Sequence, residues 1–127
     1  MVHICVNILV REIRFYRTRS GRSPVEDFLD SLPAGLARKV VWTLRLVEAL
    51  EMVPAQYFRK LTGTEELWEV RAQHGGNIIR LLCFFDGPRV VVVTNGFAKK
   101  SQWTPLPEIA RAEERRRDYL NRDGKDE

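Results

Sequence analysis

The sequence contains few of the residues that build metal sites or nucleophilic active sites. Among 127 residues there are two cysteines and two histidines, and neither histidine has the Asp, Ser or Cys companions of a nucleophilic triad. Cys5 and Cys83 both lie in apolar runs, which indicates buried thiols in a reducing compartment, not a disulfide framework or a zinc site. Further acids near the strand ends, which a two-metal nuclease needs, are also missing. We therefore expect neither a metal nor another cofactor.

Long hydrophobic runs are absent as well. His3 and Asn7 interrupt the apolar start of the chain and Arg11 follows it, so we expect no membrane span, no secretory signal and a cytoplasmic location. The composition, 44% hydrophobic and 30% charged, is that of a globular protein. Its length predicts one domain over residues 1–127, with residues 123–127 frayed.

The charge balance favours anionic partners. A formal net charge of +4 and a pI near 9.4 suit nucleic acid, an acidic protein segment or a membrane surface. The excess is modest, so the placement of the charges carries more information than their sum.

The first half of the chain predicts one strand and two helices. Residues 2–16 are rich in β-branched and aromatic types, typical of a strand. Ser23 can cap a helix over residues 24–32, with Glu26 completing a capping box. Residues 34–50 repeat apolar side chains at helical spacing, so the two helices should form a hairpin.

The second half predicts a three-stranded antiparallel meander and a final helix. Strands over residues 67–73, 78–86 and 89–97 are separated by two turns rich in Gly, Asn, Asp and Pro. A helix should follow Thr104-Pro105 and run to about residue 121, and its apolar anchors are Ile109, Ala112, Tyr119 and Leu120. The expected architecture is α+β, in the order β-α-α-β-β-β-α, with an antiparallel sheet packed by the helical hairpin.

Arg80 is the most informative residue. Its predicted strand is apolar on both faces, and such a strand rarely holds a charge unless the charge is paired or used. An ion pair with Glu69 or Glu66 is one explanation. The other is a ligand site, because the Gly-Gly turn brings Arg71 beside Arg80, and two adjacent cations favour an anion between them.

Other cations and one aromatic residue extend this site. Lys99 and Lys100 leave the last strand of the same sheet, and Lys60, with Arg59, precedes the meander, where it can contact phosphates. Trp103 lies in a polar stretch and either stacks on a base or anchors the last helix. Without metal ligands or a nucleophile, RNA cleavage here would use the substrate's own 2′-hydroxyl, with cations stabilising charge and moving protons.

Five segments in this order resemble the HigB-like, phage-derived branch of the RelE/ParE toxin superfamily. The resemblance extends from about residue 23 to residue 120. The segments are Lys60-Leu61-Thr62-Gly63, Leu67-Trp68-Glu69-Val70-Arg71, Gly76-Asn77-Ile78-Ile79-Arg80, Asn95-Gly96-Phe97-Ala98-Lys99-Lys100-Ser101-Gln102 and Thr104-Pro105.

The resemblance implies a RelE-like fold and the toxin of a type II toxin–antitoxin pair. Such a toxin cleaves mRNA, usually on the ribosome, and is held by a helix-turn-helix antitoxin, with which it binds operator DNA. By this analogy Arg71 and Arg80 grip the scissile phosphate, and Lys99 and Lys100 neutralise phosphates or transfer protons. Two alternatives stay open: a gyrase-inhibiting toxin of the same fold, and a non-catalytic nucleic-acid-binding or protein-binding module.

Overall fold

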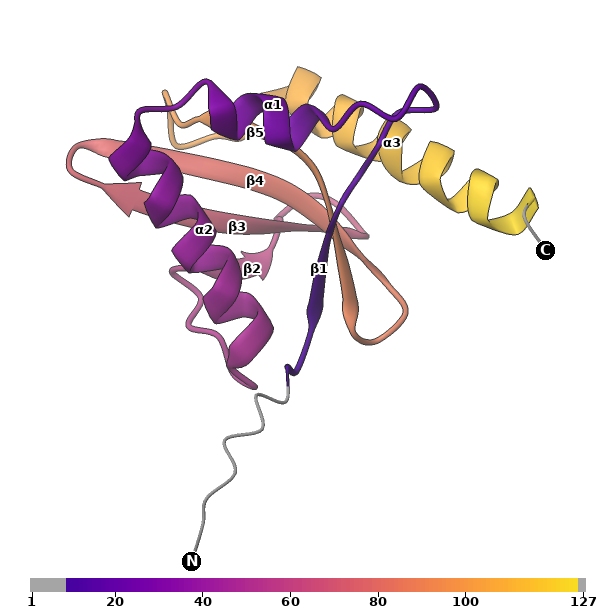
Figure 1. Cartoon of the computed structure of the whole chain (residues 1–127), viewed down its shortest axis with the longest axis horizontal. Helices are drawn as coiled ribbons and strands as arrows, with labels where there is room; N and C mark the ends of the chain where they lie inside the picture. The colour runs from indigo at the N-terminus through magenta and orange to yellow at the C-terminus, as the bar shows by residue number, and fades with distance from the viewer. Residues whose placement is uncertain (1–8, 126–127) are drawn as a thin grey trace, which may run out of the picture.

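The described part of the chain folds as an α+β protein with one five-stranded sheet and three helices (Figure 1). The computed structural model describes residues 9–125, with side chains as far as Arg122. In chain order the elements are β1 (Glu12–Phe15), α1 (Pro24–Asp30), α2 (Ala34–Ala49), β2 (Phe58–Lys60), β3 (Leu67–His74), β4 (Asn77–Asp86), β5 (Val90–Ala98) and α3 (Leu106–Lys125). Among these described residues, no helix is long and apolar enough to cross a membrane.

The sheet confirms the predicted meander and adds to it. Its strand order is β1-β5-β4-β3-β2, and β2 to β5 are paired antiparallel. β1, however, runs parallel to β5, so the sheet as a whole is mixed. This pairing joins residues nearly eighty positions apart, and no local pattern specifies it.

Two predicted boundaries were wrong, and one strand was missed. β1 begins at Glu12 because the preceding backbone is tied to α2, where the N–H groups of Val10 and Arg11 donate to Glu48 O; residues 1–8, with His3 and Cys5, lie outside the described part. β2 was missed, since three residues are too few to show a period of two. α3 continues to Lys125, beyond its predicted end near residue 121.

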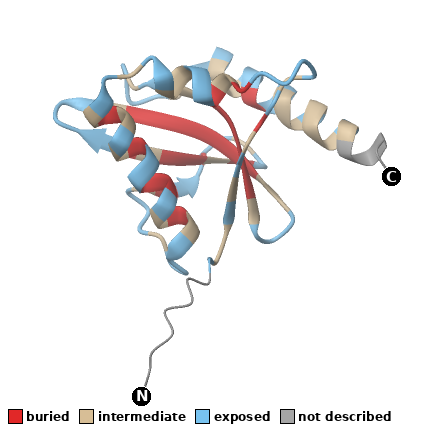
Figure 2. Ribbon diagram, viewed as in Figure 1, coloured by how far each residue is buried: buried red, intermediate tan, exposed pale blue. Residues whose placement is uncertain are grey.

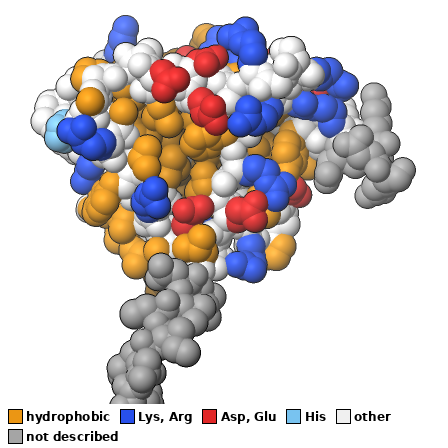
Figure 3. Space-filling view, in the orientation of Figure 1, with side chains coloured by type: hydrophobic (Ala, Val, Ile, Leu, Met, Phe, Trp, Pro, Cys, Tyr) orange, Lys and Arg blue, Asp and Glu red, His pale blue; other side chains and the backbone are white. Residues whose placement is uncertain are grey.

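The predicted N-cap of α1 is confirmed, but Glu26 does not complete a capping box, and its carboxylate lies 3.3 Å from the Arg17 guanidinium instead. The hydroxyl of Ser23 accepts a hydrogen bond from the N–H of Glu26, and Pro24 occupies the first helical position. α1 packs on β5, whereas α2 packs on β3 and β1. The two helices diverge from their short connection, so the predicted hairpin is an open one (Figure 1). Figure 3 shows the apolar side chains exposed between them, with charged residues around.

The sheet is buried on both faces (Figure 2). The face under α1 and α2 packs aliphatic side chains of β3, β4 and β5, together with Cys83. Cys83 is a free, fully buried thiol whose pKa is raised by burial, as expected for a structural cysteine. The opposite face packs on α3 through the anchors predicted for it, Ile109, Ala112, Tyr119 and Leu120.

α3 is fixed to the sheet by polar contacts along its length. The Tyr119 hydroxyl donates to Asp86 at 2.8 Å, and the Arg115 guanidinium donates to Thr94 O at 2.8 Å. The helix packs mainly on β4 and β5. On that face α3 does not extend over β3 and β2, and polar side chains lie there instead.

Candidate functional site

The register of the meander places Arg71 and Arg80 directly opposite each other. Arg71 on β3 pairs with Arg80 on β4, and Arg80 pairs in turn with Phe97 on β5. Directly opposite residues on one face of a sheet have Cβ atoms roughly 5 Å apart. The structure thus brings the two arginines together as the sequence predicted.

Lys99 joins them just past the end of β5. Its N–H donates to Ile78 O at 2.8 Å, which keeps this segment alongside β4. Partial desolvation lowers the pKa of the partly buried Lys99, and the positive charges of Arg71 and Arg80 lower it further. Lys100, one residue on, is exposed.

Glu69 lies in the middle of this group of cations. Its carboxylate is fully buried on β3, with Oε2 3.4 Å from the Nε of Arg80 and Oε1 3.3 Å from the Nε of Arg59. The ion pair considered for Arg80 is therefore real, and its partner is Glu69. It does not neutralise the cluster, because one carboxylate faces Arg59, Arg71, Arg80 and Lys99. We call these five residues the basic cluster.

Arg80 is held in place while its charge is incompletely matched. Only 3% of the residue is exposed, and its Nη1 donates to Thr104 Oγ1 at 2.9 Å. Burial lowers its pKa, while Glu69 acts in the opposite direction. The Nε of Arg80 and the Oε2 of Glu69 are close enough for an ion pair, yet neither atom has a hydrogen-bond partner in the described part of the chain. A buried guanidinium held in this way is pre-oriented for an incoming anion.

Two predicted binding residues lie apart from this group. Lys60 is exposed and pairs with Trp68, so it projects from the opposite face of β2 to Arg59. Trp103 is 76% exposed in the loop before α3, and Ser101 hydrogen-bonds to its backbone. It does not anchor the helix, so that alternative was wrong, and base stacking remains a prediction.

Sequence reasoning missed two contributions to the cluster. Arg59 was assigned only a secondary place beside Lys60, because β2 and hence the facing of its side chains were not recognised. Thr104 was seen as a helix start, and nothing in the sequence signalled its bond to Arg80. His74 is not a member of the basic cluster, because it projects toward α2, where its ring lies beside Gly35.

The described residues contain no group of three or more His, Cys, Asp or Glu side chains that could hold a metal ion. The charges available to a ligand in the basic cluster are those of the guanidinium and ammonium groups. Guanidinium forks match the geometry of phosphate, and a lysine with a lowered pKa can carry a proton. The arrangement is thus suited to binding a phosphodiester and stabilising added charge on it.

Fold and cluster together define a small α+β protein with a group of cations on one face of its sheet. A family model described as phage-derived protein Gp49-like (DUF891) matches residues 27–117. The chain belongs to this family, which is a toxin family of the RelE type, related to toxin–antitoxin systems. The match includes every member of the basic cluster. No curated protein matches the chain.

Proposed function

We propose that this protein is a HigB-like toxin of a type II toxin–antitoxin system that cleaves mRNA without a metal ion. The observation that carries the proposal is the basic cluster, in which four cations surround one buried carboxylate. Membership of a toxin-type family supports the biological role, and the cluster supports the chemistry.

The proposed reaction uses a nucleophile supplied by the RNA. The 2′-oxygen attacks the adjacent phosphorus, the bond to the 5′-oxygen breaks, and the products carry a 2′,3′-cyclic phosphate and a 5′-hydroxyl. Negative charge grows on the non-bridging oxygens during this step, where Arg71 and Arg80 stabilise it. Such preorganised donors act most strongly when they are withdrawn from water, as Arg80 is.

Lys99 is suited to proton transfer in this reaction. Its lowered pKa brings its protonated and neutral forms closer in free energy near neutral pH than in an ordinary lysine. Neutral Lys99 takes the proton of the 2′-hydroxyl, or protonated Lys99 supplies one to the leaving oxygen. Lys100 is exposed beside it and neutralises a neighbouring phosphate.

The remaining parts of the proposal follow from the resemblance. The substrate is mRNA on the ribosome, in the cytoplasm. A helix-turn-helix antitoxin restrains the toxin, and the pair binds its operator DNA. Lys60 and Trp103 are proposed RNA contacts outside the basic cluster.

Inducible expression followed by mapping of mRNA 5′ ends tests the activity. The proposal predicts growth arrest with new 5′-hydroxyl ends inside reading frames. Arg80→Lys, which keeps the charge but loses the guanidinium fork, should produce far fewer such ends at equal protein level.

Two rival functions predict different results. Growth arrest with intact mRNA and altered DNA supercoiling would instead identify a gyrase-inhibiting toxin. Normal growth at full expression of the soluble wild-type protein would favour a non-catalytic binding module.

A further inference from the structure

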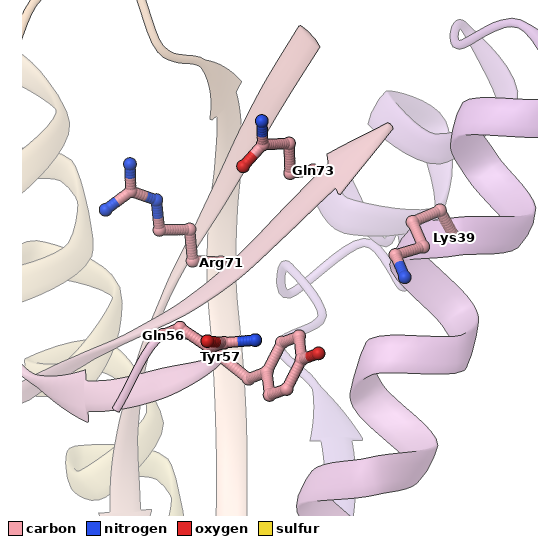
Figure 4. A pocket seen from close by; sticks show the side chains of 5 residues that line it. All are labelled: Lys39, Gln56, Tyr57, Arg71 and Gln73. Atoms are coloured by element: carbon pink, nitrogen blue, oxygen red, sulfur yellow. The ribbon is translucent and has the colours of Figure 1, made fainter. Parts of the chain in front are cut away.

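A groove of about 480 Å³ lies at the edge of the sheet, beside the basic cluster. It is lined by Lys39, Gln56, Tyr57, Arg71 and Gln73, and we call it the edge groove (Figure 4). Small-molecule sites usually enclose roughly 300–1,000 Å³, so a nucleotide unit fits the available space. Arg71 belongs to both the basic cluster and the edge groove, so the two sites are continuous.

The groove exists because β2 is short. β2 pairs with β3 only as far as Val70, and the last bond between them runs from the Arg71 N–H to Tyr57 O at 2.8 Å. Among residues 9–125, no strand pairs with the end of β3 beyond this bond on that side. In Figure 4, Arg71 projects toward one face of β3, while Tyr57 projects toward α2, where Lys39 lies. The groove therefore leads from the basic cluster around the edge of the sheet to α2.

An aromatic pair stands at the α2 end of this groove. The rings of Tyr57 and Trp42 meet edge to face, with centroids 5.9 Å apart, and the Nζ of Lys39 lies 3.8 Å from the centroid of the Trp42 ring. Trp42 remains 43% exposed although it is a large aromatic residue on a helix. A partly exposed aromatic pair beside a cation is typical of surfaces that stack nucleobases and contact the adjoining phosphate.

The polar lining fits the same kind of ligand. The five lining residues include two cations and no carboxylate. The amides of Gln56 and Gln73 both donate and accept hydrogen bonds, which is the chemistry that reads the edges of unpaired bases. An apolar peptide would leave these groups without partners, and an acidic one would not use the aromatic rings.

We propose that the edge groove binds a nucleotide of single-stranded RNA next to the scissile bond, with its base on the Tyr57–Trp42 pair and its phosphate at Lys39. This inference rests on the proposed function, because it takes the scissile phosphate to lie between Arg71 and Arg80. It adds a second subsite, which holds the RNA strand as it passes around the edge of the sheet.

The test is the affinity for a short, fluorescein-labelled RNA whose 2′-hydroxyls are methylated, so that it binds but cannot be cleaved. Tyr57→Ala should weaken binding about five- to 150-fold, as expected for the loss of one base–aromatic stack. Trp42→Ala should also weaken RNA binding, although Trp42 is more exposed than Tyr57. Lys39→Gln should also reduce the slope of log K against log salt by about 0.7, the value for one phosphate contact on a single strand.

Arg45→Gln is the matched control for Lys39→Gln. It removes the same charge from an exposed position of the same helix, outside the edge groove, and should leave the salt slope close to that of the wild type. Thermal melting of every variant separates loss of binding from loss of fold. If Tyr57→Ala and Trp42→Ala lower only the melting temperature and bind RNA normally, the aromatic pair merely braces α2 and the proposal is overturned.

Cleavage of ribosome-bound mRNA, measured in parallel, separates this inference from the proposed function. Wild-type cleavage together with unchanged affinities of the Lys39 and Tyr57 variants would overturn the subsite and leave the nuclease intact. Weakened binding by these variants without any wild-type cleavage would support the RNA groove and remove the nuclease. Loss of affinity in Trp103→Ala alone would place the base on the loop before α3 and overturn the inference.

Discussion

Two groups of cations in this molecule differ in what surrounds them. Arg115, Arg116 and Arg117 are consecutive in the sequence. In the structure, Arg115 donates to a backbone carbonyl and Arg116 lies 3.9 Å from Glu66. The basic cluster, in contrast, is assembled from β2, β3, β4 and the end of β5, around a single carboxylate.

The difference shows that local charge density is a poor guide to a binding site. Arg115 and Arg116 brace α3 against the sheet and the loop before β3. The guanidinium of Arg115 also lies 5.8 Å from the centroid of the Tyr16 ring, and that of Arg116 lies 5.8 Å from the centroid of the Phe84 ring. The cations of the basic cluster repel one another and lower the pKa of Lys99. An excess of like charge held in a fixed arrangement is relieved by an anionic ligand, and braced arginines need none.

The largest effect is expected at Arg80. Arg80→Lys should lower the rate of cleavage of ribosome-bound mRNA about 100- to 1,000-fold, the range for losing one preorganised donor to a developing charge. Arg80→Ala should in addition destabilise the fold by about 3–5 kcal/mol, because it leaves the Glu69 carboxylate buried without its closest buried cation. Cleavage assays and urea unfolding of both variants measure these effects. A fully active Arg80→Lys protein would contradict the assignment.

Glu69 should affect stability more than binding. Glu69→Gln removes the only carboxylate of the basic cluster and leaves Arg80 buried without a counter-charge, so we expect a loss of about 3 kcal/mol in the free energy of unfolding. The same change makes the cluster more positive, so the folded variant should bind the methylated RNA at least as tightly as the wild type. Urea unfolding and anisotropy titration measure the two quantities. Weaker RNA binding by the folded variant would mean that Glu69 itself contacts the ligand.

Lys99 should separate stability from activity. Its pKa is lower in the folded chain than in the unfolded one, so between these two values the unfolded chain binds the additional proton and stability rises with pH. Below its lowered pKa the folded wild type carries an unfavourable charge on Lys99, so Lys99→Gln should melt no lower than the wild type there while cleaving more slowly. Melting curves and cleavage rates from pH 6 to about 10 test this. A lower melting temperature across that range would show that the ammonium group stabilises the fold.

The smallest effect is expected among the three consecutive arginines of α3, Arg115 to Arg117. Arg116→Ala removes a partly exposed ion pair with Glu66, a type of contact that contributes about 0–1 kcal/mol. Cleavage and RNA affinity should stay within twofold of the wild type, about 0.4 kcal/mol. A tenfold loss of affinity would extend the RNA-binding surface along α3 and weaken the contrast between the two groups.

Much of the fold could be predicted because its signals are local. The Ser23 cap, the two turns of the meander and the anchors of α3 depend on residues close together in the chain. The parallel pairing of β1 with β5 depends on distant residues, and β2 was too short to recognise. In the site, the facing of Arg71 and Arg80 followed from counting inward from one turn. The positions of Arg59 and Thr104 depend on β2 and on the loop before α3, neither of which has a periodic pattern.

The most direct test of the central claim compares Arg71→Ala with Arg117→Ala in cleavage of ribosome-bound mRNA by the purified protein. Both changes remove one arginine from a position that is not fully buried, so each should leave the protein folded. The account predicts a loss of at least about tenfold, or 1.4 kcal/mol, for Arg71→Ala and an unchanged rate for Arg117→Ala. Equal rates for the two variants, or a loss confined to Arg117→Ala, would contradict it.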